Sequence, residues 1–100
     1  MSIQSAFREK TSDQVKEPPQ YNVIMLNDDF TTMDFVVKIL IEVFKKDAAT
    51  AERLMLIVHK QGQAVVGTYP YDIAVTKVSR ALSMAREEGF PFRMTVEENI

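Results

Sequence analysis

The chain has 100 residues, 46% of them hydrophobic, and a formal net charge of -2 at neutral pH. That length suits one domain with one modest core, and the slightly acidic balance argues against a general nucleic-acid binder. The lack of cysteine removes thiol nucleophiles and thiolate metal sites and favours a reducing compartment. No targeting peptide and no apolar run of membrane-spanning length is recognisable, so the cytoplasm is the expected location.

Residues 1–19 differ in composition from the rest of the chain. Apolar side chains are sparse there, charges of both signs alternate from Arg8 to Glu17, and Pro18-Pro19 closes the segment. Such a sequence cannot bury enough apolar surface to offset the entropy lost on ordering. We therefore expect a flexible N-terminal extension at residues 1–19 and a folded core domain at residues 20–100.

The first half of the core domain predicts one strand and one helix. Residues 21–26 are rich in β-forming side chains and predict a strand. Residues 27–29, Asn-Asp-Asp, favour turns and helix caps and should end it. A helix capped by Thr31 or Thr32 should follow, because apolar residues recur at helical spacing from Phe35 to Phe44.

The second half predicts two more helices and two more strands. Asp47 is a good N-cap for a helix with an apolar stripe, which Gly62 should end in a left-handed conformation. Residues 64–66 predict a short strand stopped near Gly67 and Pro70. A third helix should start at about Tyr71 or Asp72 and end at Gly89, and residues 92–96 alternate as a strand does. The expected fold is α+β in the order β-α-α-β-α-β, a small three-stranded antiparallel sheet packed with three helices.

Two segments carry polar groups that a purely structural role explains poorly, namely residues 27–33 and 55–59. A free N-terminal residue presents a cationic α-amino group with three donors, so its capture requires acceptors and a negative charge. Asn27 offers an amide oxygen, Asp28 and Asp29 offer carboxylates, and a neutral His59 offers a ring nitrogen. These residue types are suited to holding an amine.

Apolar residues close to those acceptors predict a pocket for the side chain of the same ligand residue. Met33, Val36 and Leu40 share one helix face, and Met55 and His59 share another at a spacing of four. Two such helices packed together can form an apolar slot with polar groups at its mouth. Each part also has a plainer explanation: an Asx-turn or cap, a histidine at helix carbonyls, and core methionines.

The combination of three segments resembles the ClpS family of adaptors. Residues 26–36 (LNDDFTTMDFV) are similar to its signature N-D-D-Y/F-T-x-M-x-F-V, and residues 54–62 (LMLIVHKQG) are similar to L-M-x-x-V-H-x-x-G. Residues 74–78 (AVTKV) resemble its A-E-T-K stretch, and the match spans about residues 18–97. The resemblance implies a fold like the C-terminal domain of the ribosomal stalk protein. It also implies a non-enzymatic adaptor without cofactor or metal.

In this family the adaptor binds N-degrons, which are free N-terminal Phe, Tyr, Trp or Leu residues, and delivers them to a Clp AAA+ protease. The resemblance implies that Asn27, Asp28 and His59 hold the substrate α-amino group. It places the pocket edge at Asp29 and Thr31 and the pocket walls at Met33, Val36, Leu40, Met55, Val58 and Phe92, with Met33 excluding β-branched side chains. Asp72 and Lys77 match the surface that docks on the N-domain of a ClpA-type or ClpC-type unfoldase, and the N-terminal extension matches the segment used in delivery.

Three positions depart from the family pattern. Val75 stands in place of Glu in the A-E-T-K stretch, and Asp72 stands where Glu is usual, which affects docking. Phe92 replaces a common Leu and would narrow the pocket. Two other functions stay open from the residues alone. One is an enzyme or metal role around His59 with Asp28 or Asp29; the other is a protein-interaction module of the same fold with a non-degron partner.

Overall fold

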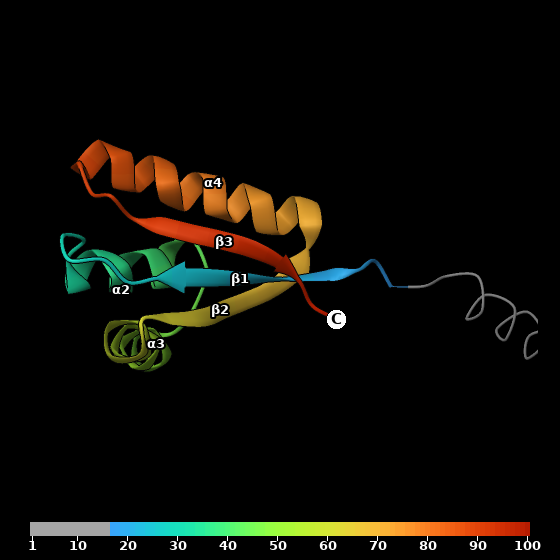
Figure 1. Ribbon diagram of the computed structural model, residues 1–100, viewed down its shortest axis with the longest axis horizontal. Coiled ribbons are helices and arrows are strands. Elements are labelled where there is room, and N and C mark those ends of the chain that lie inside the picture. Colours follow the sequence, from blue (N-terminus) through green and yellow to red (C-terminus); the bar gives the residue numbers. More distant parts are fainter. Residues whose placement is uncertain (1–16) are drawn as a thin grey trace, which may run out of the picture.

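The computed structural model describes residues 17–100, so most of the predicted extension at residues 1–19 lies outside the described part. Figure 1 shows the elements in chain order. They are β1 (Gln20–Leu26), α2 (Met33–Glu42), α3 (Ala48–Gln61), β2 (Gln63–Pro70), α4 (Tyr71–Glu88) and β3 (Arg93–Glu98). The predicted order β-α-α-β-α-β is confirmed.

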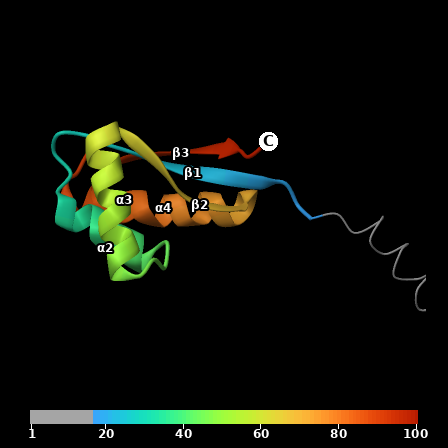
Figure 2. The same cartoon turned by 90° about the horizontal axis from the view of Figure 1, so that it is seen from below.

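The three strands form one antiparallel sheet with the order β2-β1-β3. The first strand of the chain is therefore the central one, and the strands before and after α4 pair on either side of it. The three helices of residues 17–100 lie on one side of this sheet (Figure 2). This arrangement confirms the predicted α+β class.

Local capping fixes the helix ends as the sequence indicated. Thr32 caps α2, with its Oγ1 accepting from the backbone N–H of Phe35 at 3.2 Å. Asp47 caps α3 by accepting from the backbone N–H of Thr50 at 3.2 Å. Gly62 follows α3 with φ of 92°, a left-handed conformation that strains any residue with a β-carbon.

Strand β2 spans Gln63–Pro70 and is longer than the predicted residues 64–66, although it ends at Pro70, one of the two predicted stops. Val23 pairs with Gly67 while Ile24 pairs with Val65, which leaves one extra residue in β2 as a bulge. The ring of Tyr69 lies where a β-carbon at position 67 would be. The glycine therefore allows a bulge within a continuing strand, and pairing extends to Pro70.

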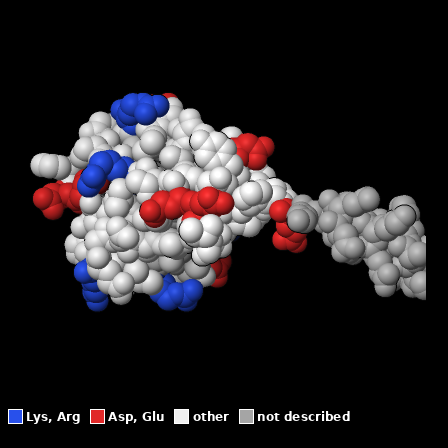
Figure 3. All heavy atoms as spheres, turned by 45° about the vertical axis from the view of Figure 1, so that its right-hand side comes forward, with Lys and Arg blue, Asp and Glu red and all other residues white. Residues whose placement is uncertain are grey.

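The face drawn in Figure 3 carries acidic and basic side chains interspersed. Within residues 17–100, no helix combines the length and the apolar character required to cross a bilayer.

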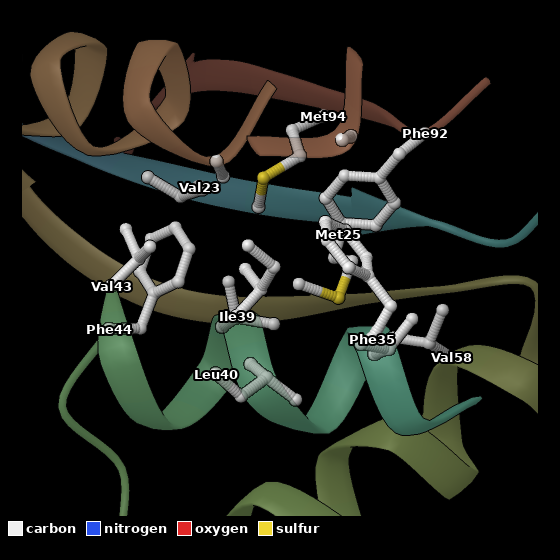
Figure 4. Packing of buried hydrophobic residues seen from close by; sticks show 14 of the residues in the cluster. Val23, Met25, Phe35, Ile39, Leu40, Val43, Phe44, Val58, Phe92 and Met94 are labelled. Carbon is white, nitrogen blue, oxygen red and sulfur yellow. The ribbon is translucent and has the colours of Figure 1, made fainter. Parts of the chain in front are cut away.

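The hydrophobic core lies between the sheet and the helices. In Figure 4, apolar side chains of α2 point toward β1 and its neighbours, with Ile39 beneath Val23 and Met25. The largest fully buried side chains of the core are those of Val23, Met25, Ile39, Leu40, Val43 and Val66. This packing holds the start of α2 and the end of α3 in place at one end of the sheet.

Candidate functional site

A cavity of about 380 Å³ opens at the end of the sheet where β1 leads into α2 and where α3 ends. That volume is at the small end for ligand sites, and it is suited to one side chain rather than to a large molecule. The lining comes from two stretches of chain that are distant in sequence: Asn27, Asp28, Asp29, Phe30, Thr31, Thr32, Met33 and Val36, and then Met55, Val58 and His59.

Backbone hydrogen bonds bring these two stretches together. The N–H of Asn27 donates to the carbonyl of Gly62 at 2.9 Å, directly after Leu26 has paired with Gln63. The N–H of Gly62 in turn donates to the carbonyl of Val58, which closes the last turn of α3. Because His59 lies in that turn, the end of β1 and the imidazole reach the same cavity.

Asp28 organises the loop between β1 and α2. Its Oδ1 accepts from the backbone N–H groups of Phe30 at 2.8 Å and Thr31 at 2.7 Å. Its Oδ2 accepts from the Thr31 hydroxyl at 2.7 Å. Burial opposes ionisation, but these hydrogen bonds and the charge of Arg93 hold the pKa of Asp28 below its ordinary value of 3.8. The loop thus presents a fixed negative charge at the cavity.

The acceptors that face this cavity are not all occupied. A carboxylate offers about four acceptor positions, and the three bonds from Phe30 and Thr31 leave Asp28 with capacity for one more. Within residues 17–100, neither the side-chain amide of Asn27 nor the imidazole of His59 is engaged in a side-chain hydrogen bond. The site can therefore accept hydrogen bonds from a cationic donor.

The apolar part of the cavity comes from two helices. Val36 and Val58 are buried at 8% and 2% exposure and form its inner surface. Met33, the first residue of α2, is 44% exposed and stands at the opening, while Met55 is half-buried on α3. The cavity combines a charged, hydrogen-bonding side with an apolar interior.

The sequence placed eleven residues at this site, and the structure brings nine of them into the lining. Leu40 is instead fully buried in the core, one turn beyond Val36 on α2. Phe92 is also in the core, where its ring packs edge-on against Phe35 at a centroid distance of 5.9 Å. Neither residue lines the cavity, because both belong to the hydrophobic core (Figure 4).

Comparison with known proteins gives a consistent result. Residues 16–95 match the family described as ATP-dependent Clp protease adaptor protein ClpS. The chain belongs to the ClpS family. An ATP-dependent Clp protease adapter protein ClpS from Acetivibrio thermocellus is 50% identical over 97 residues, covering 97% of this chain and 98% of the relative. One from Clostridium acetobutylicum is 43% identical, covering 98% and 99% of the two chains.

A solved structure extends this likeness to three dimensions. The chain resembles Agrobacterium tumefaciens ClpS2 bound to L-phenylalaninamide, with 40% identity and a TM-score of 0.80. The match covers 83% of this chain and 100% of that one. The predicted family, the ClpS-like fold and the predicted role as a non-catalytic adaptor of the Clp protease are therefore confirmed.

Two residues that the ClpS resemblance assigned to unfoldase docking lie on α4. This helix begins at the opposite end of the sheet from the β1–α2 loop (Figure 1). Asp72 is exposed in its first turn. Lys77 is half-buried, its ammonium donates to the carbonyl of Val43 at 2.9 Å, and it lies 5.3 Å from the centre of the Tyr69 ring. Lys77 thus ties α4 to the end of α2.

Sequence reasoning missed two residues of the lining, Phe30 and Thr32. Thr32 was assigned only as a candidate helix cap, and in the structure it both caps α2 and lines the cavity. Phe30 is 74% exposed, although it is aromatic and sits beside the fixed carboxylate of Asp28. The available signal was its position between turn residues, where an aromatic side chain contributes nothing to a core. Among residues 17–100, no cluster of three or more His, Asp or Glu side chains is arranged for a metal ion.

Proposed function

We propose that this ClpS adaptor captures proteins by a free N-terminal Phe, Tyr, Trp or Leu residue and delivers them to the Clp AAA+ unfoldase. The observation that carries the proposal is the single small cavity at which amine acceptors and an apolar interior adjoin. The relative from Agrobacterium was solved with L-phenylalaninamide. This compound has a free α-amino group, a benzyl side chain and one amide, and so mimics an N-terminal phenylalanine.

The α-amino group is held by Asn27, Asp28 and His59 in this proposal. The amine is cationic at neutral pH, and charge-assisted hydrogen bonds to it contribute roughly 1.5–3 kcal/mol each. The support is that Asp28 is ionised and keeps one acceptor position, while the side chains of Asn27 and His59 line the same cavity. Asp29 and Thr31 form the edge of the site.

The first side chain occupies the apolar interior between Met33, Val36, Met55 and Val58. Burying a large apolar side chain contributes about 1.5–3 kcal/mol. Neither this term nor the amine contacts alone gives tight binding, so the site requires both features in one residue. Met33 at the opening excludes β-branched side chains, because it narrows the entrance beside the ligand β-carbon.

Delivery uses the opposite end of the molecule. We assign docking on the N-domain of a ClpA-type or ClpC-type unfoldase to the start of α4, where Asp72, Tyr71, Ile73 and Val75 are exposed. Lys77 supports this surface from beneath through its bond to Val43. The extension at residues 1–19 engages the unfoldase during transfer of the substrate, and ATP hydrolysis belongs to that partner.

Fluorescence anisotropy with a labelled peptide that begins with Phe tests the capture step. A peptide of identical sequence with an acetylated N-terminus lacks the charge, and its affinity should collapse. Equal affinity of the two peptides would refute the amine site. If neither peptide binds while the purified chain still associates with an unfoldase N-domain, the adaptor recognises a different, non-degron partner.

A further inference from the structure

Phe30 is the most exposed large apolar side chain of residues 17–100, apart from the C-terminal Ile100. Phe30 is 74% exposed, yet it belongs to the cavity lining. Exposed apolar residues that are scattered singly require no explanation. This one is different because it lies at the opening of a ligand cavity, among polar neighbours.

The backbone of Phe30 is held, although its side chain is exposed. Its N–H donates to Asp28 Oδ1 at 2.8 Å, and the next N–H, of Thr31, donates to the same oxygen at 2.7 Å. The Thr31 hydroxyl completes the loop by donating to Asp28 Oδ2. An aromatic ring attached to a fixed backbone offers contact surface at a small entropic cost, as in many binding sites.

The position of Phe30 relative to the amine acceptors determines what it can contact. The first residue of a bound peptide fills the cavity, with its amine at Asp28, so the chain must leave through the opening. The α-carbon of the second residue is 3.8 Å from that of the first, and the Phe30 nitrogen is 2.8 Å from the Asp28 carboxylate. The second residue therefore leaves the cavity close to Phe30, which belongs to the lining.

We propose that Phe30 forms a second subsite, which binds an extended apolar side chain at the second position of the N-degron. The proposal rests on the proposed function and goes beyond the first residue. The cavity has room for one side chain, and apart from Met33 its other rim residues are polar or charged: Asn27, Asp28, Asp29, Thr31, Thr32 and His59. Phe30 is the exposed aromatic side chain among them. A peptide with Leu, Met or Phe at its second position should therefore bind more tightly than one with Gly or Ser there.

The test is a cycle of two peptides and two proteins. The peptides begin Phe-Leu and Phe-Gly and are otherwise identical, and the proteins are wild type and Phe30→Ala. Covering about 40 Å² of apolar surface strengthens binding about fivefold, so wild type should prefer Phe-Leu by about that factor. Phe30→Ala should bind Phe-Leu and Phe-Gly with equal affinity, so the preference of about fivefold should disappear. Phe30→Leu should restore most of the preference.

Tyr71→Ala is the matched control, since Tyr71 is also an exposed aromatic residue, at 57%, and lies on α4 away from the cavity. It should keep the preference. A wild-type protein that binds both peptides equally, or a preference that survives in Phe30→Ala, overturns the second subsite while leaving the capture of the first residue intact. If wild type binds neither peptide nor L-phenylalaninamide, the proposed function itself fails.

Discussion

Replacing Asp28 by Asn separates the charge of the site from its shape. An Asn oxygen can still accept the backbone N–H groups of Phe30 and Thr31, so the loop should keep its conformation. The bond from the Thr31 hydroxyl to Oδ2 is lost, at a cost of about 1 kcal/mol in the free energy of unfolding. What disappears altogether is the negative charge that we propose to hold the ligand amine.

The expected loss of affinity follows from the partial exposure of the carboxylate. A charge-assisted hydrogen bond is worth roughly 1.5–3 kcal/mol, and Asp28 is only half-buried, so solvent screening favours the lower part of that range. We expect L-phenylalaninamide to bind about 10- to 30-fold more weakly to Asp28→Asn than to wild type. Isothermal titration calorimetry measures this difference directly.

A second ligand provides the control. The compound 3-phenylpropanamide lacks only the amine of L-phenylalaninamide, so its weaker binding should be the same for wild type and Asp28→Asn. The variant Asp29→Asn removes an exposed charge from the neighbouring position and should weaken L-phenylalaninamide less than about threefold. If Asp28→Asn weakens both ligands equally, the loop has lost its shape and the amine contact is not established. If the two variants behave alike, only a diffuse negative field acts at the site.

The same carboxylate predicts a dependence of stability on pH. Burial opposes ionisation, yet the hydrogen bonds from Thr31 and Phe30 keep the pKa of Asp28 in the folded state below 3.8. The stabilisation is therefore complete at pH values above 3.8 and is lost as the pH falls through the lower folded-state pKa. Thermal melting of wild type and Asp28→Asn should show a difference at pH 7 that disappears in strong acid. A constant difference would contradict this assignment.

Further predictions concern the opening, the anchor on α4 and the extension. Met33→Ala should admit peptides that begin with Ile or Val, and continued exclusion in a binding titration would show that Met33 is not the excluding residue. Lys77→Met leaves the Val43 carbonyl without its donor and should lower the free energy of unfolding in urea by about 1–2 kcal/mol, whereas Lys38→Met, at an exposed position, should change it little. Deletion of residues 1–17 should preserve peptide affinity and slow degradation by the protease; unaltered degradation would assign no delivery role to the extension.

Much of the fold was predictable because the residues that start and end its helices act locally. Asp47 and Gly62 are residues whose own chemistry starts and ends a helix, and both act as predicted. The sequence left Thr31 and Thr32 as equal candidates, since either hydroxyl can cap; the Phe35 N–H selects Thr32, and Asp28 engages Thr31. The extent of β2 was not predictable, because it depends on how the Tyr69 ring lies over Gly67.

The site was predictable in part for a similar reason. Helical spacing placed Met33, Val36 and Leu40 on one face, but it could not tell where the cavity ends along that face. Val36 lines the cavity and also belongs to the core, whereas Leu40 belongs to the core alone. Phe92 was assigned to the pocket from the family resemblance, and its position in the core comes from a contact with Phe35, which is far away in the chain. Spacing along a helix predicts which side chains share a face, whereas how deeply each is buried depends on the neighbouring elements.

The hydrogen bond from the Asn27 N–H to the Gly62 carbonyl has a consequence for how selectivity evolves. It joins the start of the β1–α2 loop to the residue that ends α3, through main-chain atoms that are continuous with the paired ends of β1 and β2. The cavity entrance therefore has little freedom to widen around a bulkier ligand side chain. New preferences among first residues should then arise by exchanging individual wall side chains on an unchanged scaffold. A chain without this main-chain connection would accept more kinds of first residue and discriminate among them less.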